Sequence, residues 1–437
     1  MILTYTDDEI QRLDREALRS LQLLRFKKII TQALKTDFYK KKLGGAGIKN
    51  AEDITSIDDI KKIPFTTKED LRNTYPFGLL ASSKSDVVRM HASSGTTGKP
   101  TVIYQSQNDL DNWTNLTRRS LIATGCTCDD VFQNMMTYGL FTGGIGLHYG
   151  AEKLGMFVIP ASSGNTKRQF MLMKDFQTTV VHATPSYMLH LFSEIENMGF
   201  SPEDFVLKKA MIGAEPHSEE IRRKIESCFS IDAYNSYGLS EMNGPSVAFE
   251  CTYKCGMHVW EDAYILEIVD RNSLTPLEDG EQGELVLTNL IRESTPIIRY
   301  RTRDLTKVVS GKCECGRTAR RIDRIFGRTD DMLIINGVNV FPSQIEEVIM
   351  KMPEIGNNYR ILVRKKGTLD DLIVEMEVGP DIITDDTRDL YQLKERIKDE
   401  LKASITINPH VEFHEPGQLP VQQGKAIRVV DERGELK

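Results

Sequence analysis

A segment rich in hydroxyl groups and glycine lies between two strand-like runs near residue 95. Its residues are Ser93, Ser94, Gly95, Thr96, Thr97, Gly98 and Lys99, followed by Pro100. Glycine lets backbone N–H groups approach phosphate oxygens, while hydroxyls donate further hydrogen bonds and lysine adds positive charge. The spacing differs from that of a Walker A loop, which has four residues between its first glycine and its Gly-Lys pair. The segment therefore indicates either a phosphate-binding loop or a surface turn.

A second segment combines a tyrosine, a tight turn, a hydroxyl group and a carboxylate. Its residues are Asn235, Ser236, Tyr237, Gly238, Leu239, Ser240 and Glu241. A carboxylate beside phosphate groups can hold Mg²⁺, because this ion prefers hard oxygen ligands. The segment therefore indicates a magnesium-binding glutamate beside a nucleotide, or a strand-to-loop turn with a solvated glutamate.

A third group of residues has the chemistry of a metal site. The chain contains 7 cysteines, and Cys251, Cys255, Cys313 and Cys315 lie with His258 in polar loops. Thiolate and imidazole ligands in a tetrahedral set suit Zn²⁺. The odd number of cysteines argues against a disulfide framework. We expect a structural zinc ion that stabilises the surrounding β structure, and the alternative is a group of incidental thiols.

The elements that must position these groups follow from the periodicity of apolar residues. Residues 7–43 predict a helical arm, and between about residues 86 and 231 six β-rich runs alternate with helical patterns. Strands separated by helices predict parallel sheets covered by helices. From about 259 to 309, apolar and polar residues alternate between turn signals, which predicts antiparallel strands. The remaining chain predicts a compact α+β unit.

We therefore predict an α/β protein with two domains. The large N-terminal domain (1–329) has parallel-rich sheets with helices and contains an antiparallel β subdomain at about 246–326. The small C-terminal domain (330–437) is α+β and mobile. A length of 437 residues accommodates both domains.

The composition narrows the classes of partner. The net charge is −7, with 40% hydrophobic and 27% charged residues, so a broad nucleic-acid-binding surface is not expected. No apolar stretch reaches the roughly 18 residues that a membrane-spanning helix needs. The first residues lack the basic and apolar regions of a signal peptide. We expect a cytoplasmic protein that binds no membrane.

Taken in order, these and later motifs resemble the adenylate-forming enzymes, which include acyl-CoA synthetases, adenylation domains and luciferases. The later motifs are GAEP at 213–216, YRTRD at 300–304, GRTDD at 327–331 and GK at 424–425. Within that superfamily the chain is most similar to the phenylacetate–CoA ligase family. The segments that carry this likeness are 64–78, 138–152, 250–262 and 337–348.

The resemblance implies an ATP-dependent ligase that joins an aryl acid to coenzyme A. The acid first forms an acyl adenylate and releases pyrophosphate, and the thiol of coenzyme A then displaces AMP. It further implies that the loop 93–99 holds the β- and γ-phosphates, that Glu241 holds Mg²⁺ and that Ser240 contacts the α-phosphate. The implied contacts to the rest of the nucleotide involve Tyr237, Gly238, Asn235, Gly213, Ala214, Glu215 and Pro216 at the adenine, Asp304 at the ribose and Arg328 as a nearby charge.

The same resemblance implies the remaining roles. Lys425 bridges the acid and the α-phosphate during adenylation, and Asp330 is the hinge about which the small domain rotates. The candidate walls of the acid pocket are Tyr138, Phe141, Gly143, Gly144, Ala214 and Pro245. The implied zinc ligands are Cys251, His258, Cys313 and Cys315, with Cys255 spare.

Three positions depart from the superfamily pattern. Arg303 stands where a glycine is usual, Ser240 stands where many relatives carry threonine, and Lys425 lies in the context PVQQGK rather than one of the TSGK type. Three readings remain open for the function: a CoA ligase, an adenylating enzyme for another aryl acid or a carrier protein, and a catalytically silent nucleotide-binding protein. The amphipathic N-terminal arm makes us expect a homodimer.

Overall fold

The computed structural model describes residues 5–93, 99–366, 369–379, 387–420 and 428–433. The α-helices are α1 (Asp7–Gln11), α2 (Arg15–Ala33), α3 (Asp37–Gly45), α4 (Lys68–Asn73), α5 (Gln107–Ala123), α6 (Thr142–Leu154), α7 (Thr166–Asp175), α8 (Pro185–Glu194), α9 (Glu219–Phe229), α10 (Pro342–Ile349) and α11 (Thr387–Ile405). The strands are β1 (Val87–Ala92), β2 (Val102–Ser106), β3 (Val131–Asn134), β4 (Phe157–Ile159), β5 (Val180–Ala183), β6 (Lys209–Gly213), β7 (Asp232–Leu239), β8 (Gly244–Phe249), β9 (Met257–Val259), β10 (Tyr264–Val269), β11 (Gly283–Asn289), β12 (Tyr300–Thr306), β13 (Val308–Val309), β14 (Arg321–Ile322), β15 (Gly327–Arg328), β16 (Leu333–Ile335), β17 (Val338–Val340), β18 (Ile355–Lys366), β19 (Leu369–Val378), β20 (His410–His414) and β21 (Val429–Asp431).

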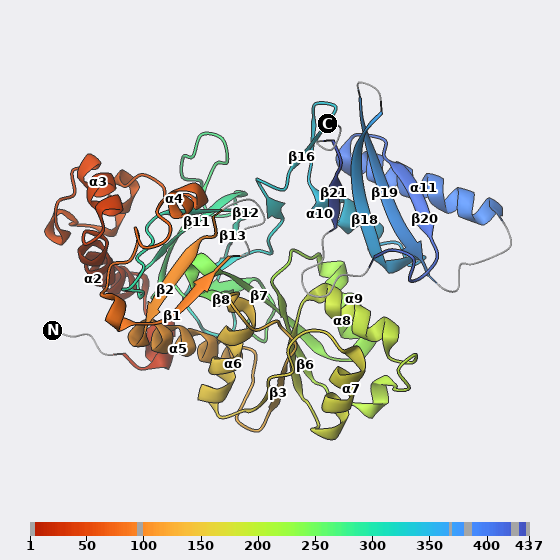
Figure 1. Cartoon of the computed structure of the whole chain (residues 1–437), viewed down its shortest axis with the longest axis horizontal. Coiled ribbons are helices and arrows are strands. Elements are labelled where there is room, and N and C mark those ends of the chain that lie inside the picture. The colour runs from red at the N-terminus through yellow and green to blue at the C-terminus, as the bar shows by residue number, and fades with distance from the viewer. Residues whose placement is uncertain (1–4, 94–98, 367–368, 380–386, 421–427, 434–437) are drawn as a thin grey trace.

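A nine-stranded sheet forms the centre of the large N-terminal part (Figure 1). Its order is β13-β14-β9-β8-β7-β6-β5-β3-β4, and β4, β3, β5, β6 and β7 run parallel. Side chains of a strand alternate between the two faces of a sheet. Along β5, Val181 and Ala183 join the apolar cluster beneath α7–α9, whereas Val180 joins the opposite cluster with Leu121 and Leu147. The predicted parallel sheet covered by helices is confirmed.

The antiparallel strands are divided between two sheets. β10, β11, β12 and β15 form a separate four-stranded sheet, whereas β8, β9, β14 and β13 extend the nine-stranded sheet. The N-terminal arm packs on this part of the molecule, because Phe26, Ile29 and Ile30 of α2 share an apolar cluster with Leu285 and Leu287 of β11.

Strands β1 and β2 form an antiparallel hairpin in a two-stranded sheet of their own. Their sequences are among the predicted β-rich runs, but they pair antiparallel, unlike the strands that helices separate. The reason is the length of the connection, since the residues between 92 and 102 cannot form the helical crossover that parallel strands require.

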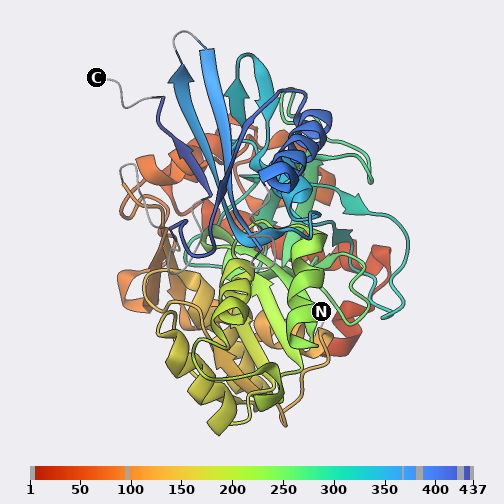
Figure 2. The same cartoon turned by 90° about the vertical axis from the view of Figure 1, so that its right-hand side faces the viewer.

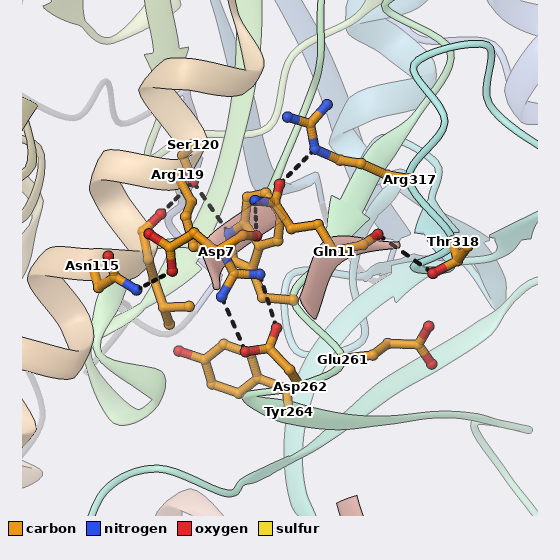
Figure 3. A network of polar contacts seen from close by, with 12 residues as sticks. Asp7, Gln11, Asn115, Arg119, Ser120, Glu261, Asp262, Tyr264, Arg317 and Thr318 are labelled. Carbon is orange, nitrogen blue, oxygen red and sulfur yellow. Dashed lines mark hydrogen bonds and ion pairs between the residues drawn. The ribbon is translucent and has the colours of Figure 1, made fainter. Parts of the chain in front are cut away.

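A polar network attaches the N-terminal arm to helix α5 and to the start of the antiparallel region (Figure 3). Asp7 accepts hydrogen bonds from Asn115 at 2.8 Å and from Arg118 at 2.5 Å. Beside it, Arg119 donates two hydrogen bonds to Asp262, at 2.9 and 3.0 Å, and both side chains are buried. Two parallel bonds between a guanidinium and a carboxylate are strong and directional, so this pair fixes α5 against the start of the antiparallel region.

The C-terminal part consists of a four-stranded sheet, ordered β20-β19-β18-β21, with α10 and α11 packed against it (Figure 2). Contacts between its described residues and the N-terminal part are both polar and apolar. Arg324 pairs with Glu347 at 3.1 Å, and the hydroxyl of Ser343 donates to the carbonyl of Phe326. Met350 packs against the apolar cluster beneath α7–α9.

Among the helices of the described residues, none is both long enough and apolar enough to span a membrane.

Candidate active site

The base of the β1–β2 hairpin lies next to Glu241. Ser93 and Thr101 close the hairpin, with their hydroxyl oxygens 2.7 Å apart and the N–H of Ser93 donating to the carbonyl of Thr101 at 3.1 Å. The hydroxyl of Thr101 also donates to Oε1 of Glu241 at 3.3 Å. Lys99 is exposed. The base of the hairpin, at Ser93 and Thr101, therefore lies beside the buried carboxylate that the sequence singled out.

Glu241 sits in the short 3-10 turn Ser240–Met242 that follows β7, and its side chain is held from two sides. Besides Thr101, the hydroxyl of Tyr300 donates to the same carboxylate oxygen at 3.2 Å. The fully buried Arg292 donates to the backbone carbonyl of Glu241 at 2.6 Å. The hydroxyl of Ser240 lies 3.0 Å from that of Thr142, at the start of α6. These contacts fix a carboxylate and a hydroxyl side by side.

Tyr237, Asp304, Arg328 and Asp330 form one hydrogen-bonded row. The Tyr237 hydroxyl donates to Oδ2 of Asp304 at 2.5 Å, and Arg328 donates to Oδ1 at 2.8 Å. Arg328 also donates to both carboxylate oxygens of Asp330, at 2.9 and 3.0 Å. Strand pairing creates the row, because Asp304 on β12 lies opposite Arg328 on β15.

Burial and charge act against each other in this row. Burial raises the pKa of the Asp304 carboxyl, and Arg328 and the Tyr237 hydroxyl oppose that rise. The pKa of Tyr237 is far above its usual value because its phenol is buried and faces Asp304, so the shared proton stays on the tyrosine. The pKa of Arg328 is raised, since Asp304 and Asp330 outweigh the effect of burial. Asp304 therefore accepts hydrogen bonds as a carboxylate, although burial makes its ionised form unfavourable in free energy.

The segment 213–216 connects the end of β6 to the region before α9. Gly213 lies so close to β7 that a side chain there would strike the carbonyl of Ser236. Ala214 adopts a left-handed conformation, with φ of 69°. Oε1 of Glu215 accepts from the N–H of Ser186 at 2.6 Å, in the first turn of α8. A carboxylate at a helix N-terminus is stabilised by the unpaired N–H groups there, so this side chain holds the segment against α8.

Asn235 lies beside this segment on β7 and is buried. Its backbone N–H donates to the Glu250 carboxylate at 2.7 Å. Burial raises the pKa of Glu250 to about 7.

Of the candidate residues for the acid pocket, Gly143 and Gly144 lie in the first turn of α6 and Tyr138 and Phe141 precede it, whereas Ala214 follows β6. A side chain at Gly143 would overlap the ring of Phe141, and one at Gly144 would lie 2.6 Å from the carbonyl of Thr137. At Gly146, an added Cβ would lie 2.7 Å from the Pro245 ring. Glycine at these positions therefore lets α6 approach its surroundings closely. Phe141 is exposed and Tyr138 is half-buried.

Cys251, His258, Cys313 and Cys315 come together in the structure. Their ligand atoms all lie within 4.8 Å of one another, with Cys251 and Cys313 sulfurs 3.6 Å apart and Cys315 Sγ 3.4 Å from Nε2 of His258. All seven cysteines are free of disulfides. Spacings of this size suit four ligands around one tetrahedral zinc ion, so the donor set fits the metal that the sequence predicted.

The structure adds two details about the surroundings of this cluster that the sequence left open. The cluster lies at the end of the nine-stranded sheet that contains β9 and β14, not in the separate four-stranded sheet. Cys255 Sγ lies 3.3 Å from Cys313 Sγ, but its other neighbour is Arg321, which donates to it at 2.8 Å.

Several predicted site residues lie outside the described residues: Lys425, Ser94, Gly95, Thr96, Thr97 and Gly98. Three residues that sequence reasoning missed are Thr101, Tyr300 and Arg292. A hydroxyl just beyond Pro100 was a usable signal for Thr101, and Tyr300 begins the YRTRD motif. The sequence has no local feature that marks Arg292, because its role depends on a distant turn.

Two family models match the chain. Residues 19–290 match the AMP-binding enzyme family, and residues 337–433 match the AMP-binding enzyme C-terminal domain. The phenylacetate–coenzyme A ligase of Escherichia coli is 44% identical over 436 residues, with 99% of each chain covered. That of Thermus thermophilus is 43% identical over 440 residues, which cover 97% of this chain and 99% of the relative.

The chain belongs to the phenylacetate–CoA ligase family. As a member of this family it is an ATP-dependent, AMP-forming acyl–CoA ligase. The fold agrees with solved structures of 2-hydroxyisobutyryl-CoA ligase, which cover 99% of this chain and are 24–25% identical. The TM-score is 0.91 against the postadenylation state with its 2-HIB-AMP complex and 0.72 against the thioesterification state with CoA.

Proposed function

We propose that this enzyme is a phenylacetate–CoA ligase that works through a phenylacetyl adenylate. The observation that carries the proposal is the 43–44% identity to phenylacetate–CoA ligases over almost the whole chain. A carboxylate is a poor electrophile, because its leaving group would be oxide. Transfer of AMP from ATP to the acid supplies a better leaving group, which the thiol of coenzyme A then displaces.

Positioning and electrostatics dominate both half-reactions, since each moves negative charge on phosphate and carboxylate oxygens. The hairpin loop 93–99 would hold the β- and γ-phosphates, and Ser240 would donate to the α-phosphate. Glu241 would hold Mg²⁺, which neutralises phosphate charge when bound. The buried carboxylate beside the hairpin base fits this ion, because its oxygens are hard ligands and Thr101 and Tyr300 orient them.

The nucleoside would lie along the row of hydrogen-bonded residues described above. Tyr237 would lie against the adenine, with Gly238, Asn235 and the segment 213–216 around it. Asp304 would accept from the ribose hydroxyls with its remaining lone pairs, and Arg328 would keep it ionised. The acid would bind near Tyr138, with Phe141, Gly143, Gly144, Ala214 and Pro245 as further walls.

We propose a domain boundary between residues 329 and 330, with Asp330 as the hinge. The two matched family regions, 19–290 and 337–433, support a division of this kind. The higher TM-score against the postadenylation state supports the inference that the C-terminal domain adopts the orientation of the first half-reaction. Rotation would bring residues 337–340, which include strand β17, towards the entering pantetheine arm.

We propose that Cys251, His258, Cys313 and Cys315 hold one structural Zn²⁺. The four ligand atoms fill a tetrahedral set, so the ion would contribute to folding rather than to chemistry. It would join the loop after β8 to strand β9 and to the loop between β13 and β14. The homodimer and the cytoplasmic location remain predictions from the sequence.

The proposed function is tested by acid-dependent exchange of pyrophosphate into ATP across a panel of aryl acids. We expect phenylacetate to support the fastest exchange and AMP release to require coenzyme A. A carrier-protein ligase would instead show exchange but no AMP release on addition of coenzyme A, because its acyl acceptor is the thiol of a carrier protein. A silent nucleotide-binding protein would show no exchange with any acid.

The role of Lys425 is tested separately for each half-reaction. We expect Lys425→Ala to abolish exchange, because an ammonium group offsets the repulsion between the acid and the α-phosphate. The same variant should still form the thioester from supplied phenylacetyl adenylate and coenzyme A. Equal loss of both half-reactions would contradict this role.

A further inference from the structure

A row of hydrogen bonds runs from strand β3 through Tyr138 to the middle of helix α6. Asn134 donates from Nδ2 to the Tyr138 hydroxyl at 2.8 Å. The same hydroxyl lies 3.1 Å from Nδ1 of His148, and Nε2 of His148 lies 3.0 Å from a carboxylate oxygen of Glu152. His148 and Glu152 are four residues apart on α6, so they lie on the same face of the helix.

The Asn134 end of the row has a fixed direction. The backbone N–H of Met136 donates to Oδ1 of Asn134 at 3.2 Å, and a backbone N–H can do nothing but donate. Nδ2 of Asn134 therefore points the other way, where it donates to the carbonyl of Gly144 at 2.5 Å and to Tyr138. The Tyr138 oxygen is consequently an acceptor in this bond, and its own hydrogen is left for another partner.

The Glu152 end fixes the other direction. An ionised carboxylate accepts hydrogen bonds and donates none, so Nε2 of His148 carries the hydrogen that faces Glu152. In the neutral imidazole Nδ1 is then a bare acceptor. The hydroxyl of Tyr138 donates to it, and both ends of the row agree on this arrangement.

We propose that His148, oriented by Glu152, is a positioning residue that sets the specificity of the acid pocket for apolar aryl rings. It does so by taking the single O–H hydrogen of Tyr138, which leaves that wall of the pocket without a hydrogen-bond donor. The inference rests on the proposed function, which places Tyr138 in the wall.

The proposal predicts lower activity with acids whose aromatic ring contains an atom that needs a hydrogen-bond donor, such as a pyridine nitrogen. A phenyl ring loses no hydrogen bond when it enters the pocket, whereas a pyridine nitrogen leaves water and finds no donor. Phenylacetate and the pyridylacetates have nearly the same size and shape, so steric effects cancel in the comparison. For the isomer whose nitrogen faces Tyr138, we expect kcat/KM about 5- to 100-fold below that for phenylacetate.

The test compares kcat/KM for phenylacetate and the three pyridylacetate isomers, in alkaline buffer where the pyridine nitrogen is unprotonated. His148→Phe removes Nδ1 but keeps a ring against Tyr138 and Tyr149, which the imidazole contacts edge-on at centroid distances of 5.7 and 5.4 Å. We expect the preference for phenylacetate over that isomer to fall by about 3- to 10-fold, because the freed hydroxyl can donate to the ring nitrogen. Activity with phenylacetate itself should stay within about threefold of wild type.

Three further variants separate this role from a structural one. His148→Asn places an amide oxygen near the position of Nδ1, so we expect it to restore the wild-type preference. Glu152→Gln, at a half-exposed position, can donate to Nε2 and should shift the preference in the same direction as His148→Phe. In a Tyr138→Phe background, His148→Phe should leave the preference unchanged, because the coupled hydroxyl is already absent.

An unchanged preference for every isomer in both His148→Phe and Glu152→Gln would overturn the inference while phenylacetate activity continued to support the proposed function. A wild-type enzyme that activates neither phenylacetate nor any pyridylacetate would overturn the proposed function, and this inference with it.

Discussion

Replacement of Tyr237 by phenylalanine removes one hydrogen-bond donor from the buried carboxylate of Asp304. In the native protein this donor and Arg328 each engage one carboxylate oxygen, at 2.5 and 2.8 Å. Both tyrosine and aspartate are buried, so water cannot readily take the place of the lost hydroxyl. The variant keeps the aromatic ring that we propose lies against the adenine.

The size of the effect follows from the type of bond that is lost. A hydrogen bond to a charged group contributes about 1.5–3 kcal/mol, and about 1.4 kcal/mol corresponds to a tenfold change in an equilibrium constant. The proton affinity of Asp304 should therefore rise by about 10- to 100-fold. Burial already raises the pKa of this carboxyl, and loss of the donor raises it further.

The assay is the pH profile of kcat/KM for ATP, which reports ionisations of the free enzyme. If the ionised form of Asp304 binds the ribose, activity is present above its pKa and is lost as the pH falls through it. We expect the acidic limb of the profile to move to higher pH in Tyr237→Phe.

Tyr39→Phe is the matched control, since the Tyr39 hydroxyl is also buried but bonds to Thr66 and to the N–H of Ile298. It should lower stability and leave the limb in place. An unmoved limb in Tyr237→Phe, with or without a uniform loss of activity, would refute the reasoning.

Two predictions concern stability. Asp262→Ala leaves the buried Arg119 and its neighbour Arg25 without their shared carboxylate, and we expect the free energy of unfolding, measured in urea, to fall by about 3–5 kcal/mol. Although burial acts to raise the pKa of Asp262, the two arginines lower it. The stabilisation by the ionised carboxylate is therefore present above the usual carboxyl pKa range, and the stability difference between variant and wild type should shrink as the pH falls through the lowered pKa. A difference below about 1 kcal/mol at neutral pH would contradict the assignment. Cys313→Ser should reduce bound zinc from about one ion per chain to near zero and lower the melting temperature, whereas Cys128→Ser, at an exposed thiol elsewhere, should change neither. Equal zinc content in the Cys313 variant and the wild type would rule out the cluster as the metal site.

Local patterns were sufficient to predict most elements. The β-rich runs became strands, and the helical patterns between them correctly predicted a parallel sheet covered by helices on both faces. The pairing of β1 with β2 was not predicted, because periodicity shows that a run is a strand but not which strand it pairs with. The length of the connection contained that information.

Contacts between distant segments explain what the sequence could not predict about the site. The motif residues Glu241 and Asp304 were recognisable from their types and neighbours. Their partners were harder to foresee, because Thr101 and Arg292 meet Glu241 through tertiary packing across 140 and 51 positions of the chain. The same limit applies to His148, because its contact with Tyr138 depends on the orientation of α6 relative to β3.

The hairpin formed by β1 and β2 depends on neighbouring structure for its order. Two isolated antiparallel strands are marginally stable in water at best. The hairpin is anchored where Thr295 accepts from the N–H of Tyr104 at 3.0 Å and where Thr101 meets Glu241. Glu241, which we propose as the magnesium ligand, thus also anchors the base of the hairpin through Thr101. Replacing Glu241 with a neutral side chain would therefore remove both the anchor of the hairpin base and a negative charge of the site. The kinetic effect of such a variant would combine these two losses.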